Sequence, residues 1–215
     1  MLWMWIGLAH AAPGTITDDS GAVANTGDGI IGATDYPGSL SGIGNSFGDV
    51  IGETAQFYVD TDLNGNLAFG LKQDTTKGIN DILVIYIDSV SGGFSSTTAL
   101  TDVGDIHRKA ISGSNGAAEA PLTFATGFEA DYAIAISSHS SNNFSGLWQL
   151  KDTSHAFLDT VTHETTDADH EWWGLTMQIL GMLPGDSFDF VATYVNGLDA
   201  SRSDEFMGVA ASTVT

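Results

Sequence analysis

The sequence has 215 residues, 42% of them hydrophobic, and its six Lys and Arg against 27 Asp and Glu give a formal net charge of -21. This length and apolar content suffice for one domain with one large core. The negative field repels phosphate groups, which argues against nucleic acid and anionic lipid as partners. The chain has no cysteine, so disulfides and thiolate chemistry are excluded.

Residues 1–12 have two interpretations. Leu2–Ala9 is a short apolar run, and Ala9-His10-Ala11 fits a small-x-small cleavage site, which together predict the remnant of a secretory signal peptide. The basic residues that usually precede such a run are missing. The alternative is an N-terminal strand that packs on its own or on a neighbouring subunit. A membrane span needs about 20 apolar residues, so no transmembrane segment is predicted.

From residue 13 to about residue 52 the chain is rich in Gly, Asp, Ser and Thr and shows neither helical nor strand periodicity. We expect an irregular stretch with one or two short strands. Alternating apolar residues then predict a hairpin, with Ala55–Val59 and Leu67–Leu71 as its strands.

The turn of this hairpin is a candidate calcium site. Asp60, Asp62, Asn64 and Asn66 alternate as in the opening of an EF-hand-like loop, in which oxygen side chains converge on the ion. Position twelve of that register is Leu71, where a bidentate Glu is needed. A simple Asn64-Gly65 turn explains the same residues without metal. Calcium therefore stays a candidate ligand beside the turn.

The next segments predict further strands. Ile82–Ile87 is apolar on both faces, which indicates a central strand covered on each side. Shorter apolar patterns predict strands at 131–137, 146–150, 156–158, 171–180 and 188–195. In the 171–180 strand we expect Trp173, Leu175, Met177 and Ile179 on one face. About eight to ten strands and no long helix predict an all-β fold, a two-sheet antiparallel, jelly-roll-like β-sandwich that forms a single domain over residues 13–215.

Polar and charged residues before the 171–180 strand form a second candidate metal site. His163, Glu164, Asp167, Asp169, His170 and Glu171 crowd two imidazoles and four carboxylates into nine residues. Their spacing matches no known ligand pattern, and a polar loop is the simpler explanation of these residues. One functional hypothesis is an enzyme that uses this cluster, and it ranks below the two non-catalytic hypotheses given at the end of this section. Because there is no Cys, and because the neighbouring residues Ser138, His139 and Ser140 point different ways along the chain, we expect the chain not to be an enzyme.

Aromatic side chains are the candidate ligand-binding groups. Sugar rings stack on flat exposed faces beside hydrogen-bonding side chains. Tyr36, Trp148 and Trp172 are the candidates, because Trp172 should face opposite to Trp173 and Tyr36 lies in a loop. The alternative for each ring is packing in the core. Arg202 and Asp204 are further candidates, with a local ion pair or cap as their alternative role.

Several segments together resemble a group of exported bacterial surface proteins, many with sorting tails, whose sandwich is similar to the DOMON and family-9 carbohydrate-binding-module folds. The matching segments are Ser46–Asp49, "DILVIYIDSVSGGF" from Asp81, "GFEADYAIAI" from Gly127, "LPGDSFDFVATYVNG" from Leu183 and "RSDEFMGVA" from Arg202. The resemblance implies a β-sandwich and a secreted or cell-surface location. It implies no activity, because one fold serves many functions.

We therefore expect a secreted, non-catalytic β-sandwich that binds a glycan or another surface polymer. The alternative is a structural, self-associating surface protein, stabilised by calcium in its acidic loops.

Overall fold

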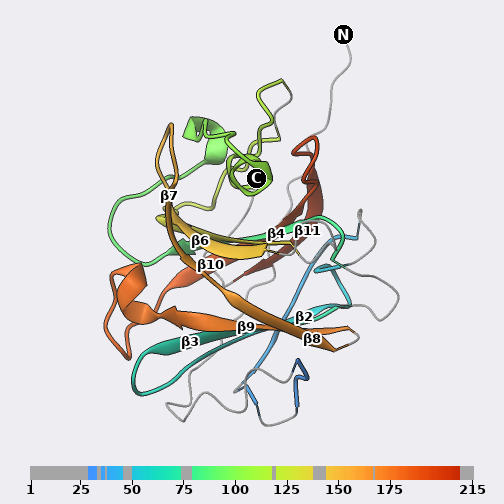
Figure 1. Cartoon of the computed structure of the whole chain (residues 1–215), viewed down its shortest axis with the longest axis vertical. Coiled ribbons are helices and arrows are strands. Elements are labelled where there is room, and N and C mark those ends of the chain that lie inside the picture. Colours follow the sequence, from blue (N-terminus) through green and yellow to red (C-terminus); the bar gives the residue numbers. More distant parts are fainter. Residues whose placement is uncertain are drawn as a thin grey trace.

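The computed structural model describes residues 29–32, 35–36, 38–45, 50–73, 79–117, 120–137, 144–166 and 168–208. The predicted signal remnant or N-terminal strand at 1–12 and the Ser46–Asp49 segment lie outside these ranges. Two antiparallel sheets face each other, with five strands in the order β1-β2-β3-β9-β8 and six in the order β11-β10-β4-β5-β6-β7 (Figure 1). The predicted all-β, two-sheet sandwich is confirmed.

The described residues contain eleven strands, against the eight to ten expected. They are β1 Leu40–Ser41, β2 Gln56–Thr61, β3 Asn66–Lys72, β4 Ile82–Asp88, β5 Tyr132–Ser137, β6 Phe144–Gln149, β7 Ala156–Thr160, β8 Thr162–Thr166, β9 Asp169–Thr176, β10 Asp189–Val195 and β11 Arg202–Gly208. The helical segments are α1 Ile106–Ser112 and the 3-10 turns Thr97–Ala99 and Met177–Leu180. Strand β8 was not predicted, because its sequence THETT carries no apolar alternation.

Strand β4 lies at the centre of the six-stranded sheet and is buried on both faces, as predicted. Its residues Leu83, Ile85 and Ile87 point into the core between the sheets. Ile82, Val84 and Tyr86 point to a second core on the outer face, under α1 and the chain between β4 and β5. The alternation of a strand explains this division, and the double cover explains the unbroken apolar run.

Strand β9 corrects the register expected around Trp172. Leu67 pairs with Leu175 and Phe69 pairs with Trp172, so two steps on β3 match three on β9. This bulge contains Gly174, whose φ of 96° is a conformation that residues with a Cβ rarely adopt. Trp172 and Leu175 therefore both face the main core, whereas Trp173 packs on the outer face. The strand ends at Thr176 and a 3-10 turn follows, so a strand to Leu180 was wrong.

Helical segments in the described ranges are short. The longest, α1, has seven residues. None of them has the length and apolar character of a membrane-spanning helix.

Candidate functional site

The three aromatic side chains predicted to bind a ligand are buried. Trp172 has no exposed surface, and Trp148 and Tyr36 are 2% and 8% exposed. The structure therefore favours the alternative weighed for each ring, which is packing inside the fold, over an exposed stacking surface. Trp172 faces inward because of the β9 bulge. Trp148 is covered by α1, where the His107 ring stacks on it and the Arg108 guanidinium lies 5.9 Å from its centroid.

Tyr36 packs on the outer face of the five-stranded sheet. Its hydroxyl donates to Glu171 Oε1 at 3.1 Å, and burial, with the Glu171 charge second, raises the pKa of the phenol. Glu171 is itself buried and also accepts the backbone N–H of Gly29 at 3.0 Å. These contacts hold the N-terminal segment on the sheet, which is a structural role.

Arg202 and Asp204 contact different parts of the fold. Arg202 donates to the Tyr86 hydroxyl at 3.2 Å and to the Ala120 carbonyl at 3.3 Å. Asp204 accepts the backbone N–H of Asn45 at 3.2 Å. In these positions the two side chains hold neighbouring segments against β11, and neither lines the pocket described below.

The candidate calcium loop is closed by its own side chains. The Asp62 carboxylate accepts the backbone N–H groups of Asn64 and Asn66 at 2.9 and 2.8 Å, and both side-chain amides as well. Slight desolvation acts to raise the pKa of Asp62, but these hydrogen bonds outweigh it and the pKa is lowered. Asp60 is buried in β2, where its charge acts on Tyr36. These contacts fit the simple Asn64-Gly65 turn, and calcium binding at this loop stays a prediction.

The residues of the second candidate metal site divide between the two faces of β8 and β9. His163 and His170 stack with core residue Trp172, whereas Glu171 contacts Tyr36 on the outer face. Asp167 lies outside the described residues. Among the side chains that the structure describes, no group of three or more His, Asp or Glu is placed to hold a metal ion.

The structure brings together a Ser–His pair that sequence reasoning missed. Ser112 Oγ lies 3.0 Å from His155 Nε2, and both side chains are buried. His155 Nδ1 accepts the backbone N–H of Lys151, which leaves the ring proton on Nε2. Nε2 therefore donates to Ser112, whose own proton goes to the Asp102 carbonyl. This direction is the reverse of a base that activates a nucleophile, so the pair does no hydrolytic chemistry in this arrangement.

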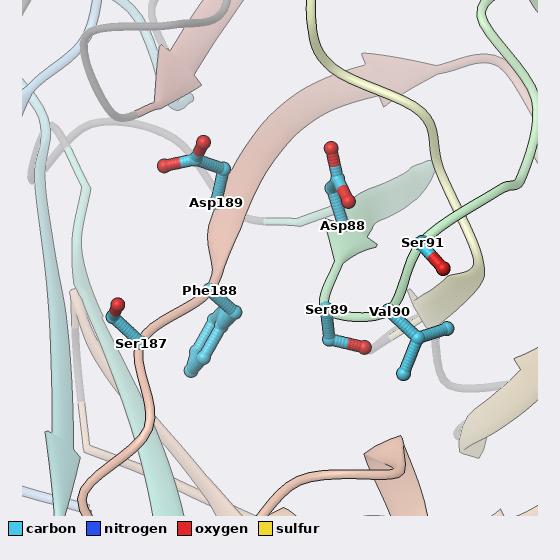
Figure 2. Close-up of a pocket in the computed structure, with 7 residues that line it drawn as sticks. All are labelled: Asp88, Ser89, Val90, Ser91, Ser187, Phe188 and Asp189. Atoms are coloured by element: carbon cyan, nitrogen blue, oxygen red, sulfur yellow. The ribbon is translucent and has the colours of Figure 1, made fainter.

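An open pocket of about 340 Å³ lies where β4 ends and β10 begins. Asp88 and Asp189 are directly paired across the two strands. Figure 2 shows their carboxylates pointing to the same side, with the Phe188 ring pointing away from them. The lining is completed by Ser89, Val90, Ser91 and Ser187, and it includes no basic side chain.

The carboxylates at this pocket act on one another. Burial, with the nearby Asp88 charge second, raises the pKa of Asp189. Burial also raises the pKa of Asp131, where Asp88 adds to the effect and the backbone N–H groups of Val90 and Ser89 oppose it. Asp131 Oδ2 accepts both N–H groups at 3.0 Å and so fixes the wall of the pocket. Like charges directly opposite on paired strands destabilise a sheet, so a ligand that donates hydrogen bonds would relieve them.

This pocket was absent from the sequence predictions. Its residues fall in the two groups 88–91 and 187–189, which are at least 96 positions apart in the sequence, and the pairing of β4 with β10 brings them together. The signal available in the sequence was Asp88, which directly follows the predicted strand Ile82–Ile87, together with Asp189, which lies near the start of the predicted strand 188–195.

No family model, no curated protein and no solved structure matches the chain.

Proposed function

We propose that this chain is an extracellular, non-catalytic β-sandwich that binds a neutral glycan at the pocket formed by Asp88, Ser89, Ser91, Ser187, Phe188 and Asp189. The observation that carries the proposal is the lining, in which two carboxylates point to the same side beside three serines and no basic side chain is present. Sugar hydroxyls donate hydrogen bonds to carboxylates. The resemblance to exported surface proteins supports the extracellular location.

The pocket suits binding better than turnover. It is wide and shallow, so a bound sugar would keep much of its surface in water, whereas enzymes exclude water from the reacting bond. An open pocket at one end of a sandwich fits an internal unit or a chain end of a long polymer.

Replacing one carboxylate should remove binding without changing the fold. Asp88→Asn and Asp189→Asn keep the shape but weaken a charge-assisted hydrogen bond, so each should lower the affinity about tenfold or more. Isothermal titration of a soluble β-glucan, a mannan and a xylan into the protein measures this. The matched control is Asp199→Asn, in the β10–β11 turn at the other end of β10, and it should bind like the wild type. The proposal would be contradicted if Asp88→Asn and Asp189→Asn bound glycan as tightly as the Asp199→Asn control, or if the wild type bound none of the glycans.

Calcium is a second candidate ligand for the same pocket, because the carboxylates of Asp88 and Asp189 are directly paired across two strands and point to the same side. A divalent cation would neutralise this local charge. Calcium titrated without glycan, and glycan titrated with EDTA, separate the two cases. Glycan binding that persists in EDTA supports the neutral glycan as the direct ligand, whereas heat from calcium alone that Asp189→Asn abolishes supports the cation.

A further inference from the structure

The edge strands on the two long sides of the sandwich have different neighbours. On one side, β11 is hydrogen-bonded to the chain that follows β1: the Ile43 N–H donates to the Phe206 carbonyl at 2.9 Å, and the Phe206 N–H donates to the Ile43 carbonyl at 3.0 Å. On the other side, the chain runs from β7 in one sheet through buried Val161 into β8 in the other. Strand β7 pairs with β6 alone among the described strands, so its outer backbone edge faces solvent.

This free edge is bordered by apolar side chains. Phe157 is 45% exposed, and Leu158 and Phe144 are each 37% exposed. Phe157 lies 6.1 Å from Phe144 and 5.6 Å from Trp148, centroid to centroid, so the exposed rings rest on a buried one. The other large apolar side chains with the highest exposure, Leu63, Leu183 and Leu198, lie outside the strands.

The rings are held in place by the sheet below them. A Cβ added at Gly146 would lie 2.9 Å from Phe144 and Trp148 and 3.0 Å from Phe157, so the three rings close over this glycine. A bulge where Leu147 and Trp148 pair with Asp159 and Phe157 leaves Leu158 as the extra residue of β7. Apolar surface is therefore presented by consecutive residues of the edge strand.

Natural edge strands are usually protected by several charges or by a covering segment. In β7 only Asp159 is charged, and no described segment covers the strand. Exposed edges with apolar pockets accept an added strand, in which backbone hydrogen bonds supply affinity and alternate side chains supply specificity.

Charge selects the partner. The chain carries a net charge of -21, and Asp159 in β7 and Asp152 just before β7 are exposed, with Lys151 as the exposed basic side chain beside Asp152. A second copy would bring the same charge and be repelled, whereas a basic segment would be attracted.

We propose that the β7 edge, with Phe144, Phe157 and Leu158, is a docking site for an extended, basic segment of a partner polypeptide, which adds to the six-stranded sheet as a further strand. This site lies apart from the Asp88–Asp189 pocket, and the inference does not rest on glycan binding.

The test uses a ten-residue peptide of alternating Lys and Val at physiological ionic strength. Its control has the same charge but Pro at two Val positions, which removes backbone donors while keeping the electrostatic attraction. The Lys–Val peptide should bind at least tenfold more tightly than the Pro control, and hydrogen exchange at the amides of residues 156–160 should slow when it binds. Phe157→Ser should remove the difference between the two peptides, whereas Leu198→Ser, which removes an exposed Leu from a turn, should keep it.

Three outcomes overturn the proposal. Equal binding of both peptides would mean charge attraction alone, and slowed exchange elsewhere with β7 unchanged would place the site on another surface. Light scattering that shows β7-dependent dimers, absent in Phe157→Ser, would make a second copy the occupant instead of a basic partner. Native thermal unfolding of Phe157→Ser confirms that the variant is folded.

Discussion

Acidification from pH 7 to pH 4 will destabilise this protein, largely through two imidazoles at the β8–β9 pair. His163 Nε2 and His170 Nδ1 lie 3.2 Å apart in nearly parallel rings, both stacked with Trp172. Burial lowers the pKa of His163 from 6.5 to about 4, and burial, with the neighbouring His163 ring second, lowers that of His170 to about 4. Among the residues that the structure describes, no carboxylate contributes to either shift.

The sign follows from which state binds protons more readily. These histidines take up protons below pH 6.5 in the unfolded chain but only near pH 4 in the folded chain. The free energy of unfolding that they contribute is therefore fully present above pH 6.5 and is lost as the pH falls from 6.5 to about 4. Protonation of one of the two imidazoles lowers the free energy of unfolding by an amount on the order of 3 kcal/mol. The second imidazole titrates coupled to the first. The raised pKa values of Asp131 and Asp189 act in the opposite direction, since those groups favour the folded state as pH falls.

Urea unfolding at pH 7, 6, 5 and 4 measures the effect. His163→Thr with His170→Leu removes both imidazoles, and the free energy of unfolding of this double variant should depend much less on pH than that of the wild type. Some dependence will remain, because burial also lowers the pKa of His107 and His155. The same pH slope in both proteins would contradict the assignment.

Trp172→Ala should be the most damaging single substitution on the five-stranded sheet. The indole is fully buried in the core between the sheets, and its loss removes the packing surface of both imidazoles. Truncating a buried Trp costs about 3 to 5 kcal/mol, because apolar burial is lost and a cavity remains. Chemical denaturation should show this loss.

Two further variants separate stability from binding. Trp172→Phe should lose less stability and bind glycan like the wild type, because the ring is not at the pocket. Leu198→Ala, at a side chain that is 85% exposed, should change the free energy of unfolding by less than about 0.5 kcal/mol. A Trp172→Phe variant that is stable but does not bind glycan would restore Trp172 as a ligand-binding residue.

Strand periodicity was enough to predict most of the sandwich. The double-faced apolar run Ile82–Ile87 identified the central strand, and Ala55–Val59 with Leu67–Leu71 identified the β2–β3 hairpin. Strand β8 was missed because its residues are polar. The β9 register was missed because a bulge at Gly174 interrupts the alternation, and no local pattern distinguishes such a glycine from one within a regular strand.

The candidate site was much less predictable. Trp172 and Trp148 were candidates for ligand binding with core packing as the alternative, and the β9 bulge and α1 bury them. Asp62 has the residue type of a calcium ligand, yet its oxygens are used by the turn. The pocket at Asp88 and Asp189 depends on pairing between distant strands, which a single sequence does not reveal.

The central claim, glycan binding at this pocket, is tested most directly by mapping amide chemical-shift changes in a ¹H–¹⁵N NMR spectrum as the best-binding neutral glycan is added. If the glycan binds in this pocket, the largest changes will occur at residues 88–91 and 187–189, with little change at β7, at Tyr36 or around Trp172. Changes centred on any of those other surfaces, with the pocket amides unmoved, would contradict the claim.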